Sequence, residues 1–311
     1  MLKNRNVLIT GGDKGIGKAI VMKFAENGAN VWFTYNSNIQ TAKQTKEEAS
    51  AFGKEINFFH LNLKESDSIE KLIEIIIEKN LSFNVLVNNA GYTDDNLFMR
   101  SELDKWWGVF HVIFDGAVKI THALLPGMVT QDNARIINIS SIAGLTGISG
   151  QTNYCSAKSA LIMFTKTLGK ELARLGVTVN AIAPGYVETD MTSGYDKDTK
   201  KAFKKLVPMN RFGKPEEIAD VALFLASSMS VLVLRTRSAL MRWRSFQESE
   251  SFRRLNIQLG MPYFAGSFMT SSIFPMSDSV IKPTRRSGFT PAFLRTAFAS
   301  AELTPLTCAT A

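Results

Sequence analysis

The sequence has few cysteines and no long apolar run. Its 311 residues include only Cys155 and Cys308, which show no metal-ligand spacing and no disulfide framework. No apolar run approaches the roughly 18 residues that a membrane span needs. The first strand-like run starts at residue 6, which leaves no room for a signal peptide before it. We therefore expect a cytoplasmic protein with no membrane span and no metal site.

The net charge of +8 is unevenly distributed along the chain. Residues 1–230 hold 26 Lys and Arg against 24 Asp and Glu, whereas residues 231–311 hold 10 against 4. The excess of positive charge therefore belongs mainly to the C-terminal segment, and the sequence does not indicate a nucleic-acid-binding protein. The basic residues also change in kind, from 21 Lys and 5 Arg in the first segment to 1 Lys and 9 Arg in the second.

Strand-like and helix-like segments alternate over the first 230 residues. The near-continuous apolar runs predict strands at 6–10, 30–35, 56–61, 84–88, 134–140 and 177–183. The helical patterns fall at 16–27, 39–52, 66–80, 102–128, 152–174 and 214–227. This alternation predicts an α/β fold with a parallel sheet covered by helices on both faces.

One candidate catalytic pair lies in the predicted helix at 152–174. Tyr154 and Lys158 are four residues apart, so both side chains share one face of the helix. A phenol, with a pKa near 10, donates its proton poorly unless a cation such as Lys158 stabilises the phenolate. Ser141 ends an apolar run 13 residues before Tyr154 and could hydrogen-bond a substrate carbonyl. Ser140 competes for this role, but the spacing favours Ser141.

A glycine-rich turn follows the first predicted strand. Gly11, Gly15 and Gly17 stand between an apolar run at 7–10 and a helical pattern that starts at Lys18. Glycines in this context allow backbone N–H groups to approach a pyrophosphate at the start of the helix. The turn therefore predicts a dinucleotide-binding loop.

Two further predicted strands end in motifs. The run at 85–91 ends in Asn-Asn-Ala-Gly, and the run at 177–189 contains a Pro-Gly break. The segments 95–100 and 210–219 carry further motifs. Together with the glycine turn and the Tyr154 pair, these motifs resemble the short-chain dehydrogenases/reductases. Within that family the likeness is to the 3-oxoacyl-[acyl-carrier-protein] reductases, over residues 5 to about 230.

The resemblance implies a Rossmann-type doubly wound parallel sheet and a defined chemistry. A nicotinamide cofactor would deliver hydride to a ketone while Tyr154 protonates the oxygen as general acid. Ser141 would orient the carbonyl, and Lys158 would lower the pKa of Tyr154 and bind the nicotinamide ribose. The implied reaction is NADPH-dependent reduction of a 3-oxoacyl thioester, carried on acyl carrier protein or coenzyme A, to the 3-hydroxy product.

The family pattern also implies the cofactor-binding residues. The end of the second strand, 34–37, has no carboxylate that would favour NAD, and Lys14 matches a position that is often basic in NADP-using relatives. Both features predict NADP(H). The residues that the resemblance assigns to cofactor binding are Gly11, Asp13, Lys14, Gly15, Ile16, Gly17, Asn36, Asn62, Leu63, Asn89, Ala90, Gly91, Tyr154, Lys158, Pro184, Gly185, Val187 and Thr189.

The sequence departs from the family pattern at one site position. Ile113 stands where relatives carry an asparagine that holds a water linking the lysine to solvent. His111 and Asp115 lie about 200° around the helix from it, so neither is a natural substitute. The relay is either rerouted through water or broken. A member with a broken relay would be a cofactor-binding or scaffold subunit rather than an active enzyme.

The resemblance to the family ends near residue 230. We predict a reductase domain at 1–230 and an atypical, poorly ordered segment rich in Arg, Ser and Phe at 231–311. The segment is either a fused part with its own role or a stretch read in another frame, which would prevent proper assembly. The closing strand of the sheet is then missing or altered, with 231–234 as a makeshift edge strand. Family members are usually tetramers that use this strand in an interface.

The charged stretch at 196–205 fits either a helix that covers a substrate or a solvated helix face.

Overall fold

The computed structural model describes residues 1–194 and 196–232 of the chain. The chain divides into two units, Met1–Glu248 and Ser249–Ala311, and every described residue belongs to the first. The predicted segment 231–311 lies outside the described residues except for its first two. The predicted domain boundary at residue 230 therefore stays a prediction.

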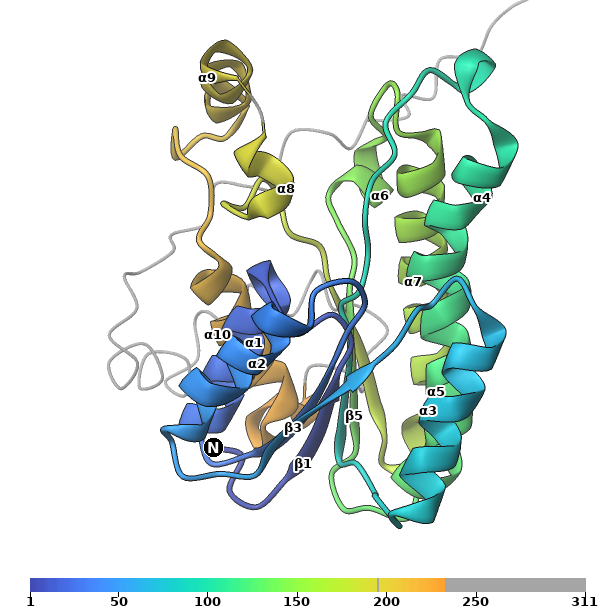
Figure 1. Ribbon diagram of the computed structural model, residues 1–311, viewed down its shortest axis with the longest axis vertical. Helices are drawn as coiled ribbons and strands as arrows, with labels where there is room; N and C mark the ends of the chain where they lie inside the picture. Colours follow the sequence, from blue (N-terminus) through green and yellow to red (C-terminus); the bar gives the residue numbers. More distant parts are fainter. Residues whose placement is uncertain (195, 233–311) are drawn as a thin grey trace, which may run out of the picture. The chain divides into compact units, whose positions relative to one another are not determined.

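In the described part of the chain, six parallel strands form one sheet in the order β3-β2-β1-β4-β5-β6 (Figure 1). Val7 of β1 pairs with Val31 of β2 on one side and with Val85 of β4 on the other. The strand order reverses between β1 and β4, where an open α/β sheet forms a crevice beyond the carboxyl ends of its strands. The strands are β1 (Asn6–Ile9), β2 (Asn30–Tyr35), β3 (Ile56–His60), β4 (Val85–Asn88), β5 (Arg135–Ile139) and β6 (Thr178–Ile182).

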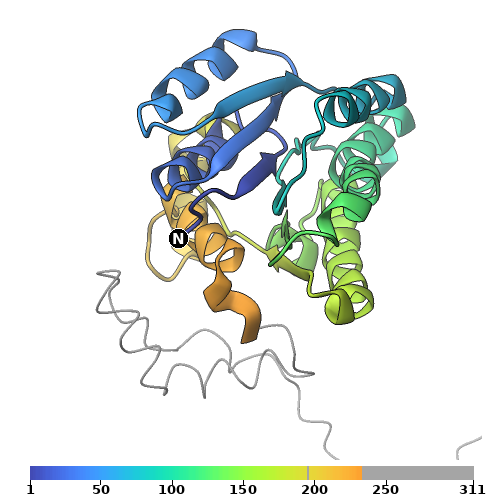
Figure 2. The same ribbon diagram turned by 90° about the horizontal axis from the view of Figure 1, so that it is seen from below.

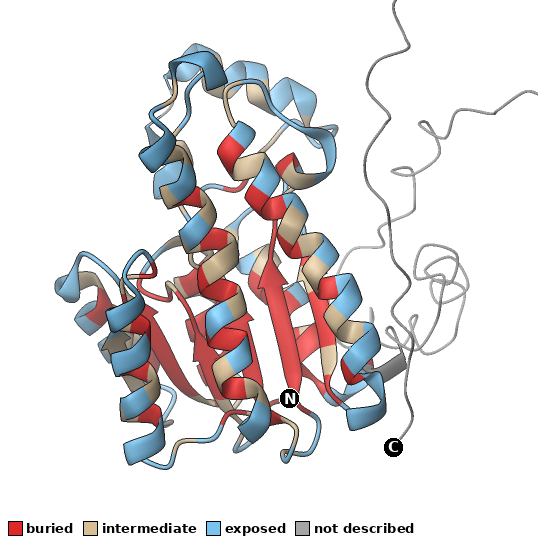
Figure 3. Ribbon diagram, turned by 90° about the vertical axis from the view of Figure 1, so that its right-hand side faces the viewer, coloured by how far each residue is buried: buried red, intermediate tan, exposed pale blue. Residues whose placement is uncertain are grey.

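Helices cover both faces of the sheet (Figure 2). Along β1, Val7 and Ile9 join the core on one face and Leu8 joins the core on the other, because successive side chains of a strand point to opposite sides. The strands are buried while the outer faces of the helices are exposed (Figure 3). One face carries α1 (Gly15–Glu26), α2 (Ile39–Ser50) and α10 (Pro215–Ala226), and the other carries α3 (Ser66–Glu78), α5 (Gly116–Met128) and α7 (Thr152–Leu172).

Among the described residues, one helical stretch, Leu103–Met128, is long and apolar enough to cross a membrane by length and composition alone. It consists of α4 (Leu103–Phe110), a π-helical turn, η2 (His111–Asp115), and α5. Its buried side chains pack inside the domain: Ile113 contacts Ala157 of α7, and the core of one sheet face includes side chains of α5. The stretch is therefore placed as a core helix of the α/β domain.

The predicted α/β fold is confirmed, since the six strands and the six long helical segments form close to their predicted bounds. The charged stretch also forms a helix, α9 (Lys197–Leu206), which begins at Asp196 because that carboxylate accepts from the backbone N–H groups of Asp198 and Thr199. Short elements of about one turn carry no periodic pattern and were not predicted. They are η1 (Phe98–Arg100), α6 (Ala143–Thr146), η3 (Ala173–Leu175) and α8 (Asp190–Ser193).

The predicted edge strand at 231–234 is wrong over its first two residues. Val231 and Leu232 belong to a 3₁₀ turn, η4 (Ser228–Leu232), that follows α10. The buried hydroxyl of Ser230 lies 2.8 Å from the backbone oxygen of Leu225, and this contact holds the turn against the end of the helix. Residues 233 and 234 lie outside the described part, in which no strand follows β6.

Candidate active site

A cavity of about 680 Å³ opens at the carboxyl ends of the strands, where the sheet order reverses. It is lined by the loops that follow each of the six strands and by the first turns of α1 and α7. Its volume is in the range of small-molecule and cofactor sites. Every residue predicted above for catalysis or cofactor binding lines this cavity, so the structure brings the whole predicted set together.

The loop after β1 has the tight geometry that the three glycines predict. Gly11 and Gly15 adopt positive φ angles of 64° and 53°, which favour glycine. A Cβ atom on Gly17 would lie 1.9 Å from the backbone oxygen of Gly11, so a side chain there is excluded. No side chain caps the start of α1, which leaves its first N–H groups directed toward the cavity end of the helix. These groups fit a pyrophosphate.

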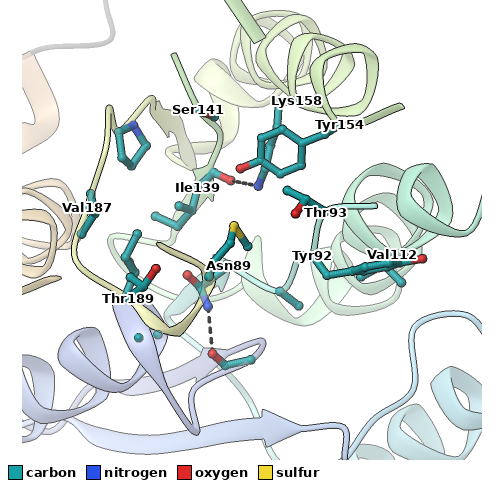
Figure 4. Close-up of a pocket in the computed structure, with 18 of the residues that line it drawn as sticks. Asn89, Tyr92, Thr93, Val112, Ile139, Ser141, Tyr154, Lys158, Val187 and Thr189 are labelled. Carbon is teal, nitrogen blue, oxygen red and sulfur yellow. Dashed lines mark hydrogen bonds between the residues drawn. The ribbon is translucent and has the colours of Figure 1, made fainter. Parts of the chain in front are cut away.

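Asn89 ties this loop to the end of β4. Its amide nitrogen donates to the backbone oxygens of Thr10 and Gly11, at 3.0 and 2.8 Å (Figure 4). The Thr10 hydroxyl in turn accepts from the backbone N–H groups of Asn89 and Ala90. The two strand ends on either side of the crevice are therefore fixed relative to each other before any ligand binds.

The candidate catalytic side chains meet on the opposite wall, where Ser141, Tyr154 and Lys158 lie near one another (Figure 4). The two candidate serines differ in their hydrogen bonds. The Ser140 hydroxyl is buried and donates to the backbone oxygen of Lys158 at 2.9 Å. The Ser141 oxygen accepts from the N–H of Ala143 at 3.1 Å, so its own proton can be donated into the cavity. Ser141 is therefore the better candidate for orienting a carbonyl.

Lys158 is almost completely buried, at 3% exposure. Its Nζ donates to the backbone oxygen of Ile139 at 2.6 Å and lies 5.6 Å from the centre of the Tyr154 ring. Burial disfavours the charged amine and lowers the pKa of Lys158 to about 7. The ammonium that would activate the phenol is thus only partly populated in the free protein at neutral pH.

Comparison with known proteins identifies the family. The sequence signature described as short chain dehydrogenase matches residues 5–200. The chain belongs to the short chain dehydrogenase family. It is 42% identical over 229 residues to the 3-oxoacyl-[acyl-carrier-protein] reductase of Aquifex aeolicus, which covers 74% of this chain and 92% of that relative. The corresponding enzyme of Thermotoga maritima is 40% identical over 232 residues, 75% of this chain and 94% of the relative.

A third relative, the 3-oxoacyl-[acyl-carrier-protein] reductase of a Synechocystis species, is 40% identical over 220 residues, 71% of this chain and 88% of the relative. The resemblance predicted from the four motifs is confirmed. This short chain dehydrogenase is accordingly an oxidoreductase, and its family binds a nicotinamide cofactor.

The structure places Ile113 beside Lys158. A Cβ atom on Gly91 would lie 3.3 Å from Ile113 Cγ1 and 3.6 Å from Lys158 Nζ, so both side chains border the same small space. Ile113 is buried and sits in the π-helical turn η2. His111 and Asp115, in contrast, lie at the surface 3.6 Å apart, and Asp115 pairs with Lys119 at 3.0 Å. The wall that faces the lysine from this helix is apolar.

Sequence reasoning did not single out several residues that line the cavity. Phe203 of α9 stacks on Tyr186, with ring centroids 4.7 Å apart, and the amide of Gln151 donates to the Asp95 carboxylate at 2.7 Å. Phe203 belongs to the charged stretch at 196–205, for which a helix that covers a substrate was one of the two predictions, whereas Gln151 follows no predicted strand end closely and carries no such signal. The further lining residues include Tyr92, Thr93, Ile148 and Met191.

The buried lysine gives the free protein a pH-dependent stability. Between pH 7 and about 10, the unfolded chain keeps a proton on Lys158 that the folded protein has lost, so unfolding becomes harder as pH rises, by at most about 1.4 kcal/mol per pH unit. We expect Lys158→Met to remove this slope and to stabilise the free protein most at pH 7. Urea unfolding of both cofactor-free proteins at pH 7, 8 and 9 measures how the free energy of unfolding changes with pH.

The matched control is Lys170→Met, which removes an exposed lysine from the last turn of the same helix and should leave the slope unchanged. A stability difference between the Lys158 variant and the native protein that is the same at all three pH values would contradict the low pKa.

Proposed function

We propose that this short chain dehydrogenase reduces 3-oxoacyl thioesters to 3-hydroxyacyl thioesters with NADPH. The observation that carries the proposal is the meeting of Ser141, Tyr154 and Lys158 on one wall of the cavity, opposite a glycine loop that fits a pyrophosphate. The printed names of the relatives support the substrate class, since they are reductases of 3-oxoacyl groups on acyl carrier protein. We therefore propose an acyl-carrier-protein-linked or coenzyme A-linked substrate.

The proposed roles follow from the atoms that face the cavity. When bound, the cofactor supplies a hydride. The Ser141 hydroxyl donates a hydrogen bond to the ketone oxygen and fixes its direction, while the Tyr154 hydroxyl transfers its proton to the same oxygen as charge develops there. Lys158, when protonated, stabilises the phenolate that remains. The phosphates of a dinucleotide would favour the charged lysine and so raise its pKa from the value in the free protein.

Part of the cavity lining suits an acyl chain. Tyr186, Phe203, Ile148 and Met191 are apolar or aromatic lining residues, and Phe203, which comes from α9, stacks on Tyr186. We propose that a thioester-linked chain lies against these side chains while the ketone faces Ser141. The lining does not by itself select a chain length.

For the cofactor we propose NADP(H). The end of β2 at residues 34–37 offers Asn36 and Ser37 to the cavity and no carboxylate. Lys14 is exposed at the cavity edge beside them and can attract a 2′-phosphate. These features support the phosphorylated dinucleotide over NAD(H).

A second function is favoured by the apolar wall at Ile113. With the lysine buried and an isoleucine beside it, proton supply to Tyr154 could be slow enough that the protein binds the cofactor without useful turnover. Dinucleotide binding together with no 3-oxoacyl reduction would identify this cofactor-binding member, whereas NADPH oxidation on addition of a short 3-oxoacyl thioester identifies the enzyme.

The general acid is tested by Tyr154→Phe, which removes the transferable proton and keeps the ring. Turnover of a short 3-oxoacyl thioester should fall by roughly 10²–10⁴-fold. Binding of NADPH, followed by its fluorescence, should persist, which separates loss of chemistry from loss of the site. Unchanged turnover would remove Tyr154 from the mechanism.

The cofactor choice is tested by Lys14→Glu, which places a carboxylate at the edge of the cavity where the 2′-phosphate is expected. Like-charge repulsion should weaken NADPH binding by about tenfold or more and shift the preference toward NADH. Lys43→Glu, an exposed change of the same charge on α2, is the control. If NADPH binds the two variants equally, Lys14 is not the phosphate partner.

The proton supply is tested by Ile113→Asn, which puts an amide beside Lys158. If proton delivery limits turnover, the rate should rise, toward the roughly 10²-fold that a positioned proton-transfer group supplies. Ile113→Val, which keeps the wall apolar, should give no such gain. A fast native enzyme that gains nothing from asparagine would show that water reaches Lys158 by another path.

A further inference from the structure

The glycine-rich loop carries a carboxylate, Asp13, at the same end of the cavity as Lys14 and Asn36. The loop runs along the end of β2, because the N–H of Gly11 donates to the Thr34 hydroxyl at 3.1 Å and the N–H of Gly12 donates to the Thr34 backbone oxygen at 2.9 Å. Asp13 is therefore brought to the strand end where a carboxylate decides between the two dinucleotides.

Asp13 is fixed in this position by α2. Its backbone oxygen accepts from the buried Thr45 hydroxyl at 3.1 Å, and its Oδ2 lies 3.0 Å from the Thr41 hydroxyl. The side chain as a whole is only 8% exposed. The carboxylate thus cannot swing out to solvent without breaking the contact with α2.

The carboxylate keeps acceptor capacity for a ligand. The Thr41 hydroxyl has one proton and also lies 2.8 Å from the backbone oxygen of Asn38, so it shares that proton between two acceptors. Among residues 1–194 and 196–232, Thr41 is the donor that reaches the Asp13 carboxylate. A carboxylate can accept about four hydrogen bonds, and a poorly satisfied buried one is stabilised by a further donor.

We propose that Asp13 is a specificity-determining residue that narrows the preference of this site for NADP(H) over NAD(H). The inference rests on the proposed function as a nicotinamide-dependent reductase. A ribose 2′-hydroxyl donates to the carboxylate, whereas a 2′-phosphate is repelled by it. Lys14 acts in the opposite sense, and the two side chains of opposite charge offset each other at one end of the cavity.

The test measures dissociation constants of NADPH and NADH by fluorescence titration of the purified full chain, with no substrate present. In the native protein NADPH should bind more tightly than NADH, but by less than about tenfold. Asp13→Asn keeps the shape of the side chain and removes its charge, so NADPH should bind about tenfold more tightly. NADH binding should stay unchanged or weaken, because the amide is a poorer partner for the hydroxyl.

Asp13→Ser is the second neutral variant. It shows whether an effect of Asp13→Asn comes from the loss of the negative charge or from the amide group that replaces it. Glu47→Gln removes one negative charge from an exposed position of α2 that does not line the cavity, and it should leave both constants unchanged. Thermal unfolding curves establish that each variant is folded.

The outcomes distinguish the role of Asp13 from the proposed reductase function. A selective gain of NADPH binding in both Asp13 variants, absent from the Glu47 variant, supports the inference. Equal effects on the two dinucleotides, or no effect, overturn it and leave the reductase function standing. A native protein that binds neither dinucleotide overturns the proposed function, and the inference with it.

Discussion

The site depends on one steric constraint, the close contact between Gly17 at the start of α1 and the backbone oxygen of Gly11. The contact leaves no room for a Cβ atom. Because the loop can close this tightly, it lies against both neighbouring strands: Thr34 of β2 accepts its N–H groups and Asn89 after β4 donates to its oxygens. The start of α1, the ends of two strands and the wall that carries the candidate catalytic side chains are thereby held around one cavity, which is already formed before a ligand binds.

The wall of the cavity that carries Lys158 surrounds its amine with groups that disfavour the charged form. The Lys158 ammonium has the Ile139 oxygen as its hydrogen-bond acceptor and Ile113 as an apolar neighbour, and its pKa falls to about 7. If the dinucleotide binds as proposed, its negative charge would come near the same amine. Cofactor binding and protonation of the lysine would then be thermodynamically coupled, and each would favour the other. The burial that lowers the pKa of the amine in the free protein also makes its protonation sensitive to a charged ligand.

Much of this architecture follows from the sequence, because buried parallel strands produce continuous apolar runs and the site motifs stand at the ends of those runs. The four-residue spacing of Tyr154 and Lys158 predicted that they share one helix face, and both side chains line the cavity. The contact of Asp13 with Thr41 was not, since it joins a loop to a helix start 28 residues away and has no pattern of its own. The depth at which Lys158 is buried and the π-helical form of η2 were likewise not predicted from the sequence.

The π-helical turn has a consequence for how this helix can vary in length. A π turn holds one residue more than the α-helical path around it, so losing a single residue there returns the helix to regular winding without rotating either flank. Helix α4 and the sheet-facing side of α5 would both keep their orientation. At any other point of Leu103–Met128, one deletion would turn every later side chain by about 100° and expose the core face of α5. Ile113, which borders Lys158, thus occupies the place where the helix tolerates the loss of one residue.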